Sequence, residues 1–193
     1  MSGSPLRLAV IVGSTREGRF GPTVGTWFAG LAEERDDMTL DVIDLADHSL
    51  PSALSATPSN EALEVLSAVT PRLDDADAFV VVTPEYNHSY PAPLKTLIDW
   101  HYAQWRAKPV GFVSYGGLSG GLRAVEHLRP VFAELHAVTV REVVSLHLAW
   151  EQFDEDGRMK GESGPVAAKA LLDQLAWWGN ALRDARAESP YGG

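Results

Sequence analysis

The chain has no cysteine among its 193 residues, so disulfide bonds, thiolate metal ligands and cysteine nucleophiles are all excluded. The six histidines show no i, i+4 pair or other ligand spacing. They are His48, His88, His101, His127, His136 and His147. We therefore predict no metal site, and structural or solvated roles for most of these side chains.

Positive charge is in short supply. Lys and Arg number 16 against 26 Asp and Glu, which gives a formal net charge of −10. Such an acidic surface repels nucleic acids and anionic membranes, so neither is expected as a partner. The apolar runs are strand-sized, far short of the roughly 20 residues that a membrane-spanning helix needs. Because residues 1–5 also lack the basic region that opens a signal peptide, we expect a soluble cytoplasmic protein.

Length and composition indicate one folded domain. A chain of 193 residues with an apolar content of 45% is large enough to bury a substantial core. Neither internal repeats nor low-complexity linkers divide it. We expect a single domain over residues 1–193, with residues 1–5 and 188–193 as loose termini.

Strand-like and helix-like patterns alternate along the chain. Short apolar or alternating runs predict five strands, at residues 6–12, 38–44, 78–83, 109–115 and 138–144. Apolar residues at helical spacing predict five helices, at residues 22–34, 60–69, 92–105, 119–135 and 165–187. We expect Thr70-Pro71 to interrupt the second helix and Pro130 to kink the fourth, because a proline removes a backbone donor and crowds the preceding turn.

Such alternation is typical of the α/β class, here a doubly wound parallel sheet with helices on both faces. The flavodoxin-like strand order 2-1-3-4-5 suits the length. In that order, ligands bind outside the carboxyl ends of the strands, at the switch point between the first and third strands. The loops after the first, third and fourth strands would meet there. We therefore expect one binding site at this edge of the sheet.

A loop of small residues and arginines, residues 13–21, joins the first strand to the first helix. Backbone N–H groups at a helix N-terminus have no partner inside the helix, and the helix dipole adds partial positive charge there. Arg16 and Arg19 bring full charges to the same place. The loop therefore predicts a phosphate site.

Two common nucleotide motifs are missing from the chain. Gly13 and Gly18 have the Gly-x-x-x-x-Gly spacing of a triphosphate loop, but that motif continues with Lys and then Ser or Thr. This chain has Arg19 and Phe20 there. A Gly-x-Gly-x-x-Gly dinucleotide fingerprint is absent too, because residues 116–121 read Gly-Gly-x-x-Gly-Gly. The loop at residues 13–21 therefore suits one terminal phosphate, as in a mononucleotide.

Three motifs together resemble the NADPH-dependent FMN reductase family, a group of flavodoxin-like proteins that includes quinone, azo-dye and chromate reductases. They are Gly13-Ser14-Thr15-Arg16, Pro84-Glu85-Tyr86-Asn87-His88-Ser89 and Leu94-Lys95-x-x-Ile98-Asp99-Trp100. The similarity extends from the first strand to the fourth helix, and the middle motif is its most specific part. The resemblance implies bound FMN with its phosphate in the loop at residues 13–21, and NADPH or NADH as a transient hydride donor.

The resemblance also implies roles for particular residues. Ser14 and Arg16 match the family's phosphate ligands, and Thr15 would assist them. Arg19 would assist too, although relatives often carry Ser there and Asn at the position of Gly21, so the individual phosphate contacts stay open. The residues after the third strand would line the ribityl chain and the ring edge, and those in and after the fourth strand would lie near the pyrimidine end. The implied cofactor-binding residues are Ser14, Thr15, Arg16, Arg19, Gly21, Pro22, Pro84, Glu85, Tyr86, Asn87, Ser114, Gly116, Gly117 and Ser119.

By the same resemblance, the protein would be an FMN-dependent NAD(P)H oxidoreductase that reduces a small acceptor in a ping-pong cycle. The acceptor would be a quinone, an azo compound, free flavin or a metal oxyanion, and the fold does not choose among them. The flavin itself carries the hydride, so we assign no catalytic side chain.

Two alternatives stay open. An electron carrier of the flavodoxin type would also be acidic and would also bind FMN. Such carriers usually sandwich the flavin between aromatic residues, whereas the loop at residues 116–121 is glycine-rich and open, which favours the enzyme. The other alternative is an α/β binding protein without a flavin.

We expect a homodimer, with a tetramer as the alternative. Asp99, Trp100 and His101 lie on the third predicted helix, which relatives use in forming dimers. Trp177 and Trp178 lie on the last predicted helix, in the core or at a subunit contact.

Overall fold

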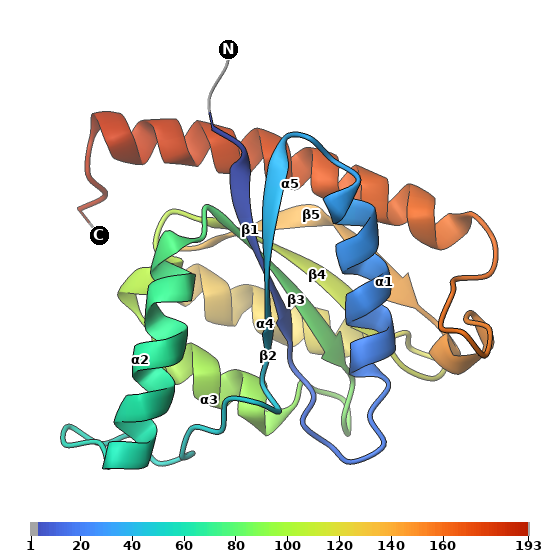
Figure 1. Cartoon of the computed structure of the whole chain (residues 1–193), viewed down its shortest axis with the longest axis horizontal. Coiled ribbons are helices and arrows are strands. Elements are labelled where there is room, and N and C mark those ends of the chain that lie inside the picture. Colours follow the sequence, from blue (N-terminus) through green and yellow to red (C-terminus); the bar gives the residue numbers. More distant parts are fainter. Residues whose placement is uncertain (1–3, 193) are drawn as a thin grey trace.

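A five-stranded parallel sheet forms the centre of the protein in this computed structural model, which describes residues 4–192 (Figure 1). The strands are β1 (Leu6–Val12), β2 (Met38–Asp44), β3 (Ala78–Pro84), β4 (Pro109–Tyr115) and β5 (Val138–Leu146). Their order is β2-β1-β3-β4-β5, and every pairing is parallel. The predicted fold class and strand order are confirmed.

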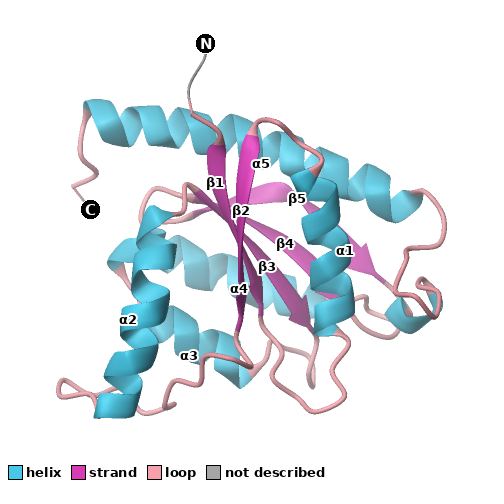
Figure 2. Cartoon of the chain, viewed as in Figure 1, coloured by secondary structure: helices cyan, strands magenta, loops and turns pink. Residues whose placement is uncertain are grey.

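Helices cover both faces of this sheet. The α-helices are α1 (Gly21–Glu33), α2 (Asn60–Asp75), α3 (Ala92–Trp100), α4 (Leu122–Glu134) and α5 (Ser163–Glu188), and the short 3-10 helices are η1 (Ala103–Trp105) and η2 (Ala149–Glu151). α1 and α5 pack on one face, whereas α2, α3 and α4 pack on the other (Figure 2). Each face of the sheet therefore has its own apolar core.

Alternation along β1 divides its side chains between the two cores. Leu6, Leu8 and Val10 belong to the core under α1 and α5, and Ala9 and Ile11 belong to the opposite core. β3 and β4 are buried at every position, as expected of central strands with helices on both sides. β2 is partly exposed, which agrees with the prediction that it lies at an edge.

The predicted interruption of α2 is wrong. The helix continues through Thr70 and Pro71 to Asp75. Pro71 removes one backbone hydrogen bond, but the buried side chains of Val69 and Leu73 hold the helix against the sheet on either side of it. Packing therefore outweighs the local effect of the proline. Pro130 likewise lies inside an unbroken α4, and a kink there stays a prediction.

The predicted end of α3 is also wrong, because the helix stops at Trp100. His101 then adopts an extended backbone and buries its ring. Its Nδ1 lies 2.8 Å from the Leu97 carbonyl oxygen and its Nε2 lies 3.0 Å from the Thr70 hydroxyl oxygen. The His101 ring is thus occupied inside the subunit, so its expected place at a subunit contact is wrong.

Other predicted boundaries differ less. α4 begins at Leu122 rather than at residue 119, because Gly120 and Gly121 have φ angles of +59° and +82°, outside the right-handed helical region. On α5, Trp177 is 66% exposed and so is not a core residue. Within the predicted loose ends, the Tyr191 hydroxyl lies 2.9 Å from a ring nitrogen of His136. Residues 1–3 and 193 lie outside the described part of the chain.

A buried lysine lies at the amino-terminal edge of the sheet, opposite the predicted site. Lys108 is 6% exposed, and its Nζ donates to the carbonyl oxygens of Leu73 and Asp74, at 2.9 and 2.8 Å. Burial, assisted by the nearby charge of Arg186, lowers the pKa of Lys108 to about 8. In the unfolded chain the same group titrates near its ordinary pKa of about 10.4.

This difference predicts a rise in stability with pH. Between about pH 8 and pH 10.4 the unfolded chain binds the Lys108 proton and the folded chain does not, so the free energy of unfolding increases through that window. We expect a gain on the order of 2 kcal/mol, measured by urea unfolding at pH 7.5 and pH 10.5. Lys108→Met should abolish the gain, and replacing the exposed Lys169 by Met should leave it intact. A gain of equal size in Lys108→Met would contradict the prediction.

Candidate functional site

The loops that follow β1, β3 and β4 meet at the carboxyl edge of the sheet, toward the bottom of Figure 1. Two side-chain contacts join them. The Ser14 Oγ lies 2.5 Å from the Tyr86 hydroxyl oxygen, and the Ser119 Oγ donates to Glu85 Oε2 at 2.8 Å. The predicted convergence of the three loops is therefore confirmed.

The loop after β1 leads into a helix N-terminus that no side chain caps. Phe20 is the N-cap residue of α1, it makes no side-chain capping bond, and the first turn holds no acidic residue. The unpaired N–H groups and the positive end of the helix dipole are therefore not balanced locally. Gly21 keeps this end tightly packed, because an added Cβ would stand 2.9 Å from the Tyr115 hydroxyl oxygen. Such a terminus suits an anion.

The two arginines of this loop have different surroundings. Arg19 forms a bidentate ion pair with Asp44 at the end of β2, at 2.5 and 2.8 Å, and it also donates to the Ser14 carbonyl oxygen at 2.8 Å. The bond with Asp44 raises the pKa of the Arg19 guanidinium. Arg16 is exposed, and its guanidinium carbon lies 5.8 Å from the centre of the Tyr86 ring. The sequence predicts Arg16 as a phosphate ligand and Arg19 as an assisting residue, but in this structure the charge of Arg19 is already neutralised by Asp44.

A tight turn shapes the loop after β3. Tyr86 and Ser89 exchange two backbone hydrogen bonds, at 2.8 and 3.1 Å, around Asn87 and His88. The latter two have φ angles of +49° and +72°, which is the backbone of a two-residue hairpin turn. Asn and His tolerate positive φ better than most residues. The turn directs the Tyr86 hydroxyl toward Ser14.

Glu85 ties the loop after β3 to the loop after β4. Its side chain is 6% exposed, it pairs with the Arg123 guanidinium, and it accepts hydrogen bonds from the Ser119 hydroxyl and from the Arg123 backbone N–H in the first turn of α4. Burial by itself would raise the pKa of Glu85, but the bonds from Arg123 and Ser119 outweigh it and hold that pKa below its ordinary value. Glu85 is thus a charged cap of α4 that fixes two loops together.

A buried hydroxyl at the end of β4 supports the glycine-rich loop that follows this strand. Ser114 is fully buried, and its hydroxyl donates to the Gly120 carbonyl oxygen at 2.8 Å. A side chain at Gly120 would not fit, because an added Cβ would stand 2.5 Å from the Ser145 Oγ. Ser114 therefore supports this loop from inside the sheet. Gly116, Gly117 and Ser119 are partly exposed on this loop, beside Leu118, which is 89% exposed.

Tyr115 lies beside the candidate site, although the sequence did not single it out. It is the last residue of β4, it is 5% exposed, and among residues 4–192 its hydroxyl has no hydrogen-bond partner. Its ring packs edge-on to Phe20 with 6.4 Å between ring centres, beneath the start of α1. Burial raises the pKa of the Tyr115 hydroxyl, which the neighbouring Tyr86 reinforces. Its position in the sequence could have indicated it. Tyr115 carries a polar hydroxyl at the carboxyl end of a central strand, and it lies two residues after Val113, so both side chains face the same core.

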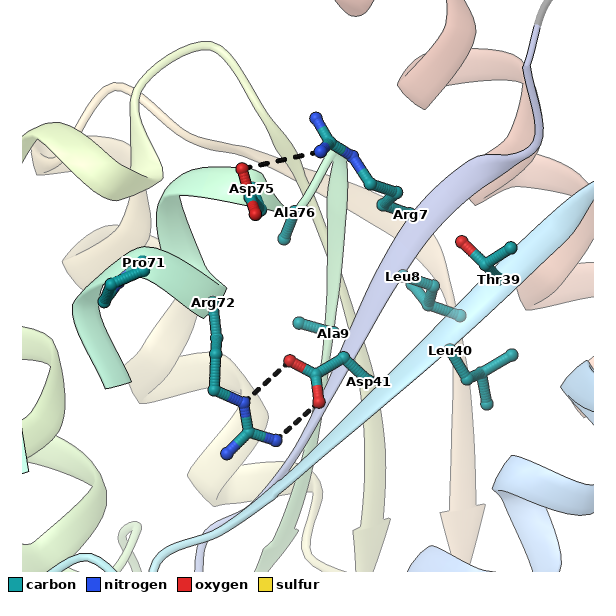
Figure 3. A pocket seen from close by; sticks show the side chains of 10 residues that line it. All are labelled: Arg7, Leu8, Ala9, Thr39, Leu40, Asp41, Pro71, Arg72, Asp75 and Ala76. Carbon is teal, nitrogen blue, oxygen red and sulfur yellow. Dashed lines mark hydrogen bonds and ion pairs between the residues drawn. The ribbon is translucent and has the colours of Figure 1, made fainter. Parts of the chain in front are cut away.

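Two hollows lie near the sheet but differ in their relation to these loops. One of about 280 Å³ lies between β1, β2 and α2, and its charged side chains are paired with each other, Arg72 with Asp41 and Arg7 with Asp75 (Figure 3). None of the predicted site residues lines it. The other, of about 360 Å³, lies beside the loop after β1 and is lined by Thr15, the loop after β2 and the first turns of α3.

Within residues 4–192, no three His, Asp or Glu side chains are grouped so that they could hold a metal ion. Over the same range, no helix combines the length and the hydropathy that crossing a membrane requires.

Comparison with known proteins identifies the family. The model of the NADPH-dependent FMN reductase family matches residues 6–151. A 2-hydroxy-1,4-benzoquinone reductase of Burkholderia sp is 30% identical over 94% of this chain and 98% of its own length. An NAD(P)H-dependent FMN reductase of Schizosaccharomyces pombe is 36% identical over 122 residues, which is 60% of each chain.

A solved structure agrees with this assignment. FerB of Paracoccus denitrificans, a flavoenzyme NAD(P)H:(acceptor) oxidoreductase, superposes with a TM-score of 0.73 and 25% identity over 91% of this chain and 98% of that one. The chain therefore belongs to the NADPH-dependent FMN reductase family: it is a flavodoxin-like oxidoreductase with FMN and NAD(P)H as its cofactors.

Proposed function

We propose that this protein transfers hydride from NAD(P)H to a small quinone-type acceptor in a ping-pong cycle, with the FMN phosphate held by the loop after β1. The uncapped N-terminus of α1 beside the exposed Arg16 is the observation that carries the proposal. Bound FMN would supply the hydride-transfer chemistry, and donor and acceptor would use the same place in turn. The quinone class follows from the Burkholderia relative, a 2-hydroxy-1,4-benzoquinone reductase.

The residues after β1 fit a phosphate dianion. The first turn of α1 offers unpaired backbone N–H groups and no acidic side chain, in a chain whose net charge is −10. Arg16 would add a charge-assisted hydrogen bond, and the hydroxyls of Ser14 and Thr15 would add neutral ones. Pro22 costs no hydrogen bond in the first turn of α1, because the backbone N–H that a proline lacks would have no partner inside the helix at that position. Arg19, in contrast, would act by cancelling the charge of Asp44 and holding the Ser14 carbonyl.

The other two loops would form the place for the flavin ring. Pro84, Glu85, Tyr86 and Asn87 would contribute mainly backbone groups, because the side chain of Glu85 is used between the loops and that of Tyr86 pairs with Ser14. On the opposite side, Gly116, Gly117 and Ser119 would allow close approach of a flat ring. Ser114 would act through the loop that it supports. The ring face beside this loop would stay open to donor and acceptor.

The proposal has a direct spectroscopic test. The purified protein, supplied with FMN, should show the flavin absorption band, lose it on anaerobic mixing with NADPH, and regain it when 1,4-benzoquinone is added. The steady-state rates should give parallel double-reciprocal lines, as a ping-pong cycle requires. Flavin uptake without bleaching by either nicotinamide nucleotide would indicate an electron carrier instead. A protein that takes up no FMN would overturn the proposal entirely.

Two finer expectations stay predictions. A homodimer, with a tetramer as the alternative, is expected from the resemblance to the family. A cytoplasmic location is expected from composition. Sedimentation and cell fractionation test these two expectations separately from the chemistry.

A further inference from the structure

The buried hydroxyl of Tyr115 has no partner within residues 4–192, although the rest of the residue is well packed. A buried hydroxyl that makes no hydrogen bond lowers stability, because it has lost its bonds to water. A phenylalanine would fill the same apolar space between Phe20 and the sheet without that loss. The hydroxyl therefore has no evident use in the flavin-free protein.

Its position points to the phosphate site. The Tyr115 hydroxyl oxygen stands 2.9 Å from where a Cβ of Gly21 would be, directly beneath the first residue of α1. That helix begins without a side-chain cap. The neighbouring hydroxyls of Ser14 and Tyr86 are paired with each other at 2.5 Å. The Tyr115 hydroxyl lies close enough to Ser14 for that residue to lower its pKa, but it makes no hydrogen bond of acceptable geometry within residues 4–192.

The hydroxyl stays protonated at physiological pH, so it can donate a hydrogen bond. Burial raises the pKa of Tyr115 above its ordinary value, and the opposing effects of Ser14, Arg19 and Arg16 do not reverse the shift. A protonated phenol beside unpaired backbone N–H groups presents donors to an incoming anion. A phosphate oxygen of FMN accepts such hydrogen bonds with the help of its negative charge. Riboflavin has an uncharged hydroxyl in place of the phosphate, so it gains less from the same donors.

We propose that Tyr115 is a specificity-determining residue, whose hydroxyl donates a hydrogen bond to the phosphate of bound FMN and so favours FMN over riboflavin. This inference rests on the proposed function, because it assumes that the phosphate lies at the N-terminus of α1. It adds a residue from β4 to a site otherwise built by the loop after β1. It also explains why a hydroxyl without a partner is kept inside the protein.

The test compares Tyr115→Phe with the wild-type full-length protein. Both are freed of flavin and titrated with FMN and with riboflavin by fluorescence quenching. We expect the FMN Kd to rise about tenfold, as for one hydrogen bond to a charged group, and the riboflavin Kd to stay unchanged. We also expect the flavin-free variant to melt about 2–4 °C higher, since it no longer buries an unpaired hydroxyl. Tyr102→Phe is the control, because Tyr102 is 49% exposed.

The other outcomes overturn the inference. An unchanged FMN Kd would mean that a water molecule alone satisfies the hydroxyl. Equal weakening of FMN and riboflavin would indicate a packing role, and a Tyr115→Phe protein that does not fold would show an essential partner inside the flavin-free chain. If the wild-type protein binds no FMN at all, the proposed function fails first, and the two failures are thereby distinguished.

Discussion

Replacing Arg19 by alanine should weaken FMN binding roughly a hundredfold, and adding Asp44→Asn should restore most of the loss. The reason is the ion pair between these two residues, whose side chains are only 17% and 22% exposed. Without Arg19, the Asp44 carboxylate would be unpaired next to the incoming phosphate, and like charges in a partly buried site repel strongly. The Ser14 carbonyl would also lose its bond from Arg19.

The measurement is a double-mutant cycle on the FMN Kd, with Arg19→Ala, Asp44→Asn and the double variant. Asp44→Asn alone should bind FMN at least as tightly as the wild type, because it frees the charge of Arg19. If the double variant binds as poorly as Arg19→Ala, Arg19 is a direct phosphate ligand and the ion pair opens on binding. Arg35→Ala is the matched control, since Arg35 forms an equally close pair with Asp173.

The second large effect concerns Arg16. Arg16→Ala should raise the FMN Kd roughly thirtyfold, which is the loss of about 2 kcal/mol from one charge-assisted hydrogen bond. The effect should shrink in 0.5 M salt, because Arg16 is exposed and its charge is screened. Titration with FMN and riboflavin at two salt concentrations measures both properties.

Arg141→Ala is the control for Arg16, because the Arg141 side chain is 86% exposed and pairs only with its neighbour Glu142 among the described residues. Its FMN Kd should match that of the wild type. An unchanged FMN Kd in Arg16→Ala would show that the phosphate does not lie in the loop after β1. Equal loss of FMN and riboflavin binding would point instead to the contact between Arg16 and the Tyr86 ring.

Strand boundaries were the most predictable feature of the fold. β1, β2 and β4 have the same bounds in the structure as in the prediction, because each is a short apolar or alternating run that ends at glycine or charged residues. Helix ends depended on contacts that no local pattern contains. α2 passes through Pro71 because buried neighbours hold it, and α3 stops at Trp100 because the His101 ring is bonded inside the core.

The sequence by itself determined the alternation of five strands with five helices and the doubly wound class, since these follow from the periodicity of apolar residues. The strand order and the convergence of three loops followed from the arrangement that suits this class and length, and small residues with arginines predicted an anion at one of those loops. It assigned Arg16 as a phosphate ligand with Arg19 assisting it, and it overlooked Tyr115. Only the tertiary structure showed that Arg19 is paired, because Asp44 comes from β2, the neighbour of β1 in the sheet, and neutralises this arginine. The same packing of β4 beneath α1 placed the Tyr115 hydroxyl beside the first residue of that helix, without a hydrogen-bond partner among the described residues.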